Sequence, residues 1–293
     1  MITDNGEEGP ASAGPSSYAG PMGEPSIDPT IMDHYENRYD EDRRIRSGIG
    51  ELELVRTREI VRRHLPDGPC RILDVGGGTG VHSEWLLDDG HTVDLIDPVP
   101  RHVAAATDRL SARPRFTAEI GEARELAAAT DTYDAVLLFG PLYHLTDRAD
   151  RIVAWSEAGR VARPGGIVVG AVISRFASLL SGLSGGAIFD DAFRSIIDRD
   201  LTDGQHRNPD PDTDWFTTAY FHRPDEVAPE VEAAGLAMHA LLGVEGISFW
   251  VEHLERSWDD PARREVIVEA ARRIEDEATL LGLGPHLLAV ATT

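Results

Sequence analysis

The sequence of 293 residues contains no lysine and only one cysteine, Cys70. A single cysteine excludes an intramolecular disulfide framework and any zinc cluster built from cysteines. No apolar run approaches the ~20 residues that a membrane-spanning helix requires. The N-terminus also lacks the basic and apolar regions of a signal peptide. These absences predict a cytoplasmic protein that does not act at a membrane.

Positive charge is scarce as well. The 28 cationic residues are all arginine and face 51 acidic residues, which gives a formal net charge of -23. Such a surface repels phosphate backbones, so nucleic acid is not an expected partner. The acidity fits adaptation to high salt or a high-GC genome that replaces lysine by arginine, and the sequence does not separate the two.

Composition along the chain predicts three parts. Residues 1–27 are rich in Pro, Gly, Ser and acidic residues, which is typical of a disordered tail. Residues 28–66 show helical apolar spacing and predict two N-terminal helices. Residues 67–293 form the main domain, with an inserted segment at 174–221. An insertion of that length is usually a lid or a binding loop.

Strands and helices alternate within the main domain, which predicts an α/β fold: a Rossmann-like, doubly wound, seven-stranded sheet with right-handed crossovers, N-terminal helices and a helical lid insertion. The predicted strands are 71–75, 92–96, 115–120, 133–139, 167–173, 238–244 and 286–291. Helices are predicted at 81–89, 101–110, 125–129, 147–161, 176–183, 189–201, 224–234 and 260–281.

A glycine loop stands between the first predicted strand and its helix. Asp74 precedes Gly76, Gly78 and Gly80 at alternate positions. Glycines let a ligand approach the backbone, and the N–H groups of the following helix point the same way. The next strand ends on Asp97, where nucleotide-binding folds hold a ribose. A nicotinamide-dinucleotide fingerprint would need a third glycine at position 81, which is valine.

The spacing Asp-x-Gly-x-Gly-x-Gly resembles the first motif of the class I S-adenosylmethionine-dependent methyltransferases, and residues 74–80 match it at every specified position. Further along, Arg163-Pro-Gly-Gly166 resembles the turn before that family's fifth strand. The resemblance covers about Leu65 to Ile173 densely. It implies S-adenosylmethionine as the cofactor and methyl transfer as the activity.

The resemblance also implies cofactor contacts, residue by residue. Asp74 would order the loop and attract the cofactor's ammonium group, and Asp97 would hold the ribose. The family's Gly-Asp-Ala type segment, which contacts adenine, is here Gly121-Glu122-Ala123, with a longer acid. The predicted cofactor-binding residues are Asp74, Gly76, Gly78, Gly80, Asp97, Pro98, Glu122, Ala123, Phe139 and Gly140.

The segment Phe139-Gly-Pro-Leu-Tyr-His-Leu145 would lie beside the methyl donor. It lacks the Asp/Asn/Ser-Pro-Pro-Tyr/Phe motif of nucleic-acid amino-methyltransferases, and the lysine-centred tetrad of ribose 2′-O-methyltransferases cannot form without lysine. A small-molecule acceptor, methylated at O, N or C, is therefore predicted. His144 is the candidate general base or orienting group, because imidazole titrates near neutral pH. Alternatively it caps the following helical region or bonds a carbonyl. Tyr143 would orient the acceptor or line its pocket.

Several alternatives stay open at this point. The chain could be an NAD(P)-binding oxidoreductase of the same sheet type, or a non-catalytic protein that binds S-adenosylmethionine. Tyr35 and Tyr39 either contact cofactor or acceptor, or pack on the sheet edge. The aromatic residues within 215–222 either sandwich a planar acceptor or form the lid's own small core. No metal is predicted, because His206 and His222 form no convincing ligand set. Pairing of the N-terminal helices would allow a homo-oligomer.

Overall fold

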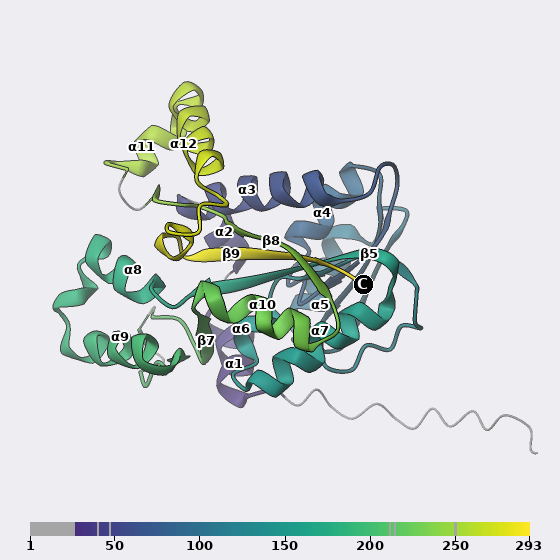
Figure 1. Cartoon of the computed structure of the whole chain (residues 1–293), viewed down its shortest axis with the longest axis horizontal. Helices are drawn as coiled ribbons and strands as arrows, with labels where there is room; N and C mark the ends of the chain where they lie inside the picture. The colour runs from purple at the N-terminus through teal and green to yellow at the C-terminus, as the bar shows by residue number, and fades with distance from the viewer. Residues whose placement is uncertain (1–26, 40, 47, 211, 214, 249–250) are drawn as a thin grey trace, which may run out of the picture.

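The computed structural model describes residues 27–293 except 40, 47, 211, 214, 249 and 250. It shows a central sheet between two layers of helices, with a helical lid at one end (Figure 1). The predicted disordered tail, residues 1–27, lies outside the described residues apart from Ile27. Within the described part, no helix combines the length and apolar character needed to cross a bilayer.

The seven predicted strands are confirmed and form the body of the sheet in the order β3-β2-β1-β4-β5-β9-β8. The first five are parallel, and β9 is antiparallel to both β5 and β8. Their bounds are β1 Arg71–Val75, β2 Thr92–Asp97, β3 Phe116–Ile120, β4 Tyr133–Leu138, β5 Ala162–Ser174, β8 Ala237–Gly243 and β9 His286–Thr292.

The sheet nevertheless has nine strands rather than seven. The two additional strands, β6 (Gln205–His206) and β7 (Ala219–His222), belong to the lid insertion. β7 pairs in parallel with the end of β5, with Ile173 opposite Phe221. Strands of two and four residues are too short to show an alternating pattern in the sequence. The lid is therefore anchored to the sheet by backbone pairing.

Helices cover both faces of the sheet (Figure 1). Trp85 of α4 and Ile60 of α3 pack with one face, whereas Trp155 of α7 and Val231 of α10 pack with the other. The helical elements are α1 Pro29–Asp33, η1 His34–Arg38, α2 Glu41–Ile45, α3 Ile49–His64, α4 Val81–Asp88, α5 Pro100–Leu110, α6 Pro141–His144, α7 Arg148–Val161, α8 Ala177–Gly185, η2 Ala187–Phe189, α9 Asp191–Asp203, α10 Pro224–Ala233, α11 Leu254–Asp259, α12 Pro261–Arg273 and η4 Leu281–Leu283.

Three local expectations are wrong. Residues 125–129 are not helical, because Glu157 and Arg160 of α7 hydrogen-bond the backbone of Leu126 and so hold the segment against that helix. The helix predicted at 260–281 ends at Arg273, where the carbonyl of Glu275 instead accepts the backbone N–H of Gly243. The region of the two predicted N-terminal helices contains four elements: the five-residue α1, η1 and α2, and the 16-residue α3.

The predicted turn at residues 163–166 lies within β5 as an irregularity. The β4–β5 register shifts between Tyr133 and Ala135, and Gly165 has a φ of +74° that favours glycine. The glycine conformation expected of a turn is therefore present, but β5 continues on both sides of it.

Candidate active site

A cavity of about 630 Å³ lies at the carboxyl ends of β1, β2, β4 and β5. Open wound sheets bind ligands at this edge. Residues from three directions line the cavity. We call them the glycine side (residues 75–79, 97–99 and 121–124), the roof (Tyr35, Tyr143, His144 and Phe216) and the histidine corner (Arg44, Glu53, Glu245 and His286).

The three glycines of the loop serve different purposes. Gly76 and Gly78 line the cavity with φ values of +70° and +56°. A Cβ at Gly76 would lie 2.8 Å from Pro141 Cδ, whereas a Cβ at Gly78 would meet no atom within 4 Å. At Gly80, with φ +83°, a Cβ would lie 2.8 Å from Leu110 Cδ1. Gly76 and Gly78 thus shape the cavity wall, and Gly80 allows close packing against α5.

Asp97 connects the glycine loop to the end of β2. Its Oδ2 accepts the backbone N–H of Gly78 at 2.9 Å. Its Oδ1 accepts the backbone N–H of Val99 at 2.9 Å and lies 3.1 Å from His102 Nδ1. Pro98 also lines the cavity. The buried carboxylate therefore fixes the two loops of the glycine side relative to each other.

Asp74 lies behind the glycine loop and not in the cavity wall. Its side chain is fully buried, and a Cβ at Gly77 would lie 2.9 Å from its Cγ. Oδ2 accepts the Ser83 hydroxyl at 2.7 Å, whereas Oδ1 has no hydrogen-bond partner. Burial raises the pKa of Asp74 to about 6. The loop thus rests on a carboxyl group that can still take one donor.

The other predicted cofactor residues gather at the cavity. Glu122, Ala123, Phe139 and Gly140 all line it. The Glu122 carboxylate accepts Nε of Arg124 at 2.9 Å, and Phe139 packs edge-on against His82 with ring centroids 4.9 Å apart. Residues from the ends of β3 and β4 therefore face the same space as the glycine loop.

His144 and Tyr143 belong to the roof. His144 Nδ1 lies 3.1 Å from the Thr218 carbonyl, so it donates, and Nε2 accepts the Tyr35 hydroxyl at 2.8 Å. Burial lowers the pKa of His144 to about 4. The Tyr143 hydroxyl donates to the Phe139 carbonyl at 3.0 Å. At neutral pH His144 is uncharged, and both its nitrogens are engaged by other parts of the chain.

Aromatic side chains of the lid stack on one another. His206 and Phe221 stack with centroids 4.6 Å apart, and Phe193 lies 5.2 Å from Trp215. Phe216 stacks on His144 at 5.7 Å. These separations are those of direct aromatic pairs. These rings therefore pack directly on one another in pairs, and they also form part of the cavity wall.

The lid also contacts the N-terminal helices over the cavity. The hydroxyls of Thr30 and Thr218 lie 2.9 Å apart, and the Thr217 hydroxyl donates to the Thr30 carbonyl at 3.4 Å. Arg38 pairs with Asp212 at 3.1 Å. Together with the Tyr35–His144 hydrogen bond, these contacts join the N-terminal helices to the lid and the roof beside the cavity.

The histidine corner was not predicted from the sequence. His286 Nδ1 lies 2.5 Å from Glu245 Oε1 and 3.6 Å from Glu53 Oε2. Arg44 pairs with Glu53 at 2.6 Å and also with Glu41. Burial alone would lower the pKa of His286, but the carboxylates of Glu53 and Glu245 raise it to about 9. The one hint in the sequence was the place of two residues relative to the predicted strands. Glu245 directly follows one predicted strand, and His286 begins the next.

In the described part of the chain, Glu53, Glu245 and His286 also form the one group with metal-ligand spacing, their ligand atoms lying within 4.8 Å of one another. Arg44 and the His286 proton already supply positive charge there. His206 and His222 lie elsewhere. His206 contacts Asp200 and the Trp215 carbonyl, and His222 contacts Glu230.

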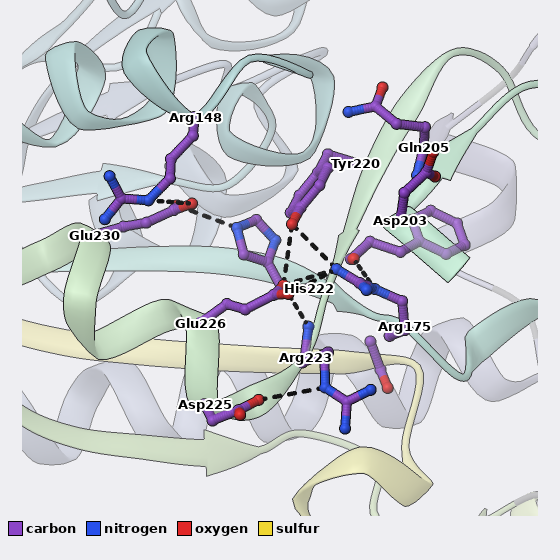
Figure 2. A network of polar contacts seen from close by, with 12 residues as sticks. Arg148, Arg175, Asp203, Gln205, Tyr220, His222, Arg223, Asp225, Glu226 and Glu230 are labelled. Carbon is purple, nitrogen blue, oxygen red and sulfur yellow. Dashed lines mark hydrogen bonds and ion pairs between the residues drawn. The ribbon is translucent and has the colours of Figure 1, made fainter. Parts of the chain in front are cut away.

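A buried ionic network supports the base of the lid (Figure 2). Arg151 and Glu230 pair at 2.7 Å with side chains 1% and 2% exposed. Glu230 also accepts from His222 at 3.2 Å, and Arg151 stacks over Tyr220 of β7 with its Cζ 3.8 Å from the ring centroid. Arg175 joins Glu226 and the Tyr220 hydroxyl. The network thus links β7 to α7 and α10.

Residues 72–166 match a family model described as a methyltransferase domain. A ubiquinone biosynthesis O-methyltransferase of Azorhizobium caulinodans is 29% identical over 67% of this chain and 73% of its own length. An uncharacterised methyltransferase of Mycobacterium tuberculosis is 33% identical over 41% of this chain. The chain spans only 48% of that mycobacterial relative.

Solved structures extend the likeness beyond the matched segment. An S-adenosylmethionine-dependent methyltransferase from Mesorhizobium loti superposes with a TM-score of 0.55, at 18% identity, over 83% of this chain and all of its own. The 1,6-didemethyltoxoflavin-N1-methyltransferase of Burkholderia thailandensis, solved with S-adenosylhomocysteine, gives 0.52 at 16% identity over 90% of this chain and 86% of its own.

Residues 72–166 therefore form a methyltransferase domain, and the chain has the fold of the S-adenosylmethionine-dependent methyltransferases.

The glycine side of this methyltransferase fits its cofactor, S-adenosylmethionine. Gly78 leaves open space where any side chain would project into the cavity. Asp74 Oδ1 is a buried acceptor without a partner, directly behind the loop. Acidic surroundings also suit a cofactor that carries a sulfonium charge. The third fingerprint position of a dinucleotide-binding loop is occupied by Val81, which is buried as the first residue of α4.

Proposed function

We propose that this methyltransferase acts on a small molecule, at oxygen, nitrogen or carbon, that binds between the roof and the histidine corner. The observation that carries the proposal is one continuous cavity that joins the glycine side to a lid-covered compartment. Its volume of about 630 Å³ lies within the range of small-molecule sites. Methyl transfer needs donor and acceptor in line, and such positioning supplies much of the rate.

When bound, S-adenosylmethionine supplies an electrophilic methyl group on a positively charged sulfur. We propose that Gly76 and Gly78 hold the cofactor through their backbone, that Asp97 and Pro98 face its ribose and that Glu122 and Ala123 face its adenine. Phe139 and Gly140 then border the methyl group. Asp74 and Gly80 act on the shape of the loop.

The roof residues have a positioning role in this proposal. Tyr143 and His144 form the wall above the acceptor, and His144 also holds Tyr35 of η1 and Thr218 of the lid. Substituting either residue would therefore loosen the roof as well as alter the acceptor's surroundings.

Two further observations favour a small acceptor over nucleic acid. The net charge of -23 opposes a phosphate backbone. Side-chain contacts between the lid and the N-terminal helices also lie next to the cavity and narrow the space that a polymer would need. By their names, the ubiquinone relative and the toxoflavin neighbour act on small molecules. Homo-oligomerisation through the N-terminal helices is a separate prediction, which a molar-mass measurement by light scattering would test.

Calorimetry with S-adenosylmethionine, S-adenosylhomocysteine and NADH tests the cofactor, and we expect binding of the first two alone. Transfer of labelled methyl from S-adenosylmethionine to a panel of phenols, carboxylic acids and amines then tests the activity. Binding of NADH alone would favour an oxidoreductase. Tight binding of S-adenosylmethionine without transfer to any acceptor would favour a non-catalytic sensor.

A further inference from the structure

The histidine corner contains a buried carboxylate that orients an imidazole facing the cavity. Glu245 is 2% exposed, and its two oxygens contact Nδ1 and the backbone N–H of His286 at 2.5 and 3.2 Å. Because a carboxylate only accepts, Nδ1 carries a hydrogen whether the ring is charged or neutral. The neutral ring therefore places its lone pair on Nε2.

The Nε2 atom of His286 faces space rather than protein. The side chain is 20% exposed and lines the cavity. Among the described residues, Nε2 has no hydrogen-bond partner. It is also not one of their fully buried polar atoms, so it is reachable from the cavity. Positioned in this way, the atom can take a proton from a bound molecule.

The fold places this atom on the acceptor side of the cavity. In the sheet register His286 of β9 lies opposite Ile173 of β5, and β5 is the neighbour of β4. β4 leads into Phe139 and Gly140, the residues proposed to border the methyl group. Ile173 and Leu288 line the cavity between them. Two strand spacings, about 10 Å between backbones, separate β9 from β4, a gap that side chains and an acceptor can fill.

The other imidazoles in the described cavity wall are unsuited to this role. His144 and His206 have both nitrogens engaged. His82 Nδ1 accepts the Trp85 indole N–H at 3.3 Å, which leaves the hydrogen of the neutral ring on Nε2. His102 is paired with Asp97 on the ribose side.

We propose that His286 is the general base of the methyl transfer, oriented by Glu245. The inference rests on the proposed function and concerns acceptors that react through a hydroxyl group. The acceptor oxygen forms its bond to the methyl carbon as the carbon–sulfur bond breaks, and that bond's electron pair stays on sulfur. The hydroxyl proton passes to His286 Nε2 and then to solvent. Glu245 is a positioning residue.

The surrounding charges set the pH range in which this base works. Glu53 of α3 and Glu245 face the ring, Arg44 of α2 neutralises Glu53, and His82 of α4 is uncharged at neutral pH because burial lowers its pKa to about 4. With the pKa of His286 raised to about 9, most rings are protonated at pH 7. The rate should rise about tenfold per pH unit and level off near pH 9.

The first test is an NMR titration of the histidines in the full-length protein with S-adenosylhomocysteine. We expect one resonance with a pKa near 9 that disappears in His286→Gln. In Glu245→Gln the same resonance should titrate at least one pH unit lower. A His286 pKa at or below 6.5, or one unmoved by Glu245→Gln, would refute the dyad.

The second test measures turnover with catechol, resorcinol and 4-hydroxybenzoate, and with 4-nitrophenol, which is already ionised near neutral pH. His286→Gln should lower kcat for the first three at least 100-fold, because general bases contribute 10²–10⁴, and for 4-nitrophenol less than tenfold. His239→Gln, which changes an exposed histidine of β8, is the matched control and should leave kcat unchanged.

Equal losses with ionised and un-ionised acceptors, or loss of the pH 9 inflection in His144→Gln instead, would overturn the assignment. So would failure to methylate every hydroxyl compound while S-adenosylmethionine still binds. Absence of S-adenosylmethionine binding would instead overturn the proposed function.

Discussion

Glu230→Gln should destabilise this methyltransferase by about 3 kcal/mol. Glu230 makes three contacts of 2.7–3.1 Å to Arg151, both side chains being almost fully buried, and a fourth to His222. Removing one partner of a buried ion pair costs ~3–5 kcal/mol because the other charge stays uncompensated. Glutamine keeps the shape and one acceptor oxygen, so the lower end of that range applies.

Urea unfolding at pH 7.5, followed by tryptophan fluorescence, measures this difference through the midpoint and slope. Asp225→Asn provides a matched control in the same region (Figure 2), because Asp225 pairs with Arg223 at 3.5 Å with side chains 80% and 49% exposed. That control should change stability by less than about 0.5 kcal/mol. If Glu230→Gln and Asp225→Asn have equal effects, the buried network does not carry the stability assigned to it.

The network also reaches the active site. Arg151 Nη1 donates to the carbonyls of Leu145 and Thr146, which directly follow His144. Glu230→Gln should therefore loosen the roof and raise the KM of the acceptor more than the dissociation constant of S-adenosylmethionine. An equal loss for both ligands would indicate general unfolding instead.

Three further predictions concern the cavity. Gly78→Ala should weaken S-adenosylmethionine binding at least tenfold in calorimetry. Gly90 also has a positive φ and no atom within 4 Å of an added Cβ, so Gly90→Ala should only destabilise the fold, by ~1–2 kcal/mol. Equal affinities in the two variants would remove Gly78 from the site. Asp97→Asn should weaken binding of the cofactor at least tenfold, because an amide nitrogen would face a backbone N–H that now finds a carboxylate oxygen; unchanged affinity would contradict this role. The folded-state pKa of His286 is raised, so its contribution of about 3 kcal/mol should be complete below pH 6.5 and lost as pH rises toward 9, and His286→Gln should show no such decline in urea midpoints.

The main sheet and the glycine side could be predicted because each is encoded locally. The strands are short apolar runs, and the loop is a contiguous motif from Asp74 to Gly80. The histidine corner could not be predicted, since Glu53, Glu245 and His286 meet only when α3 packs over antiparallel β8 and β9. The helix prediction for residues 125–129 is wrong for a related reason, because contacts with a distant part of the chain decide the local structure. Their composition favours a helix, but side chains from α7 hydrogen-bond the backbone in a non-helical conformation.

The enclosure over the cavity comes from two segments far apart in the sequence, the N-terminal helices and the lid. Their described hydrogen bonds and ion pairs to each other all involve a side chain, as at Thr30–Thr218 and Arg38–Asp212, whereas β7 is fastened to β5 through the backbone. Opening the seam between the two segments would therefore break side-chain contacts and leave the pairing of β7 with β5 intact. Lid motions in enzymes take place in microseconds to milliseconds, which is fast enough to keep pace with typical turnover.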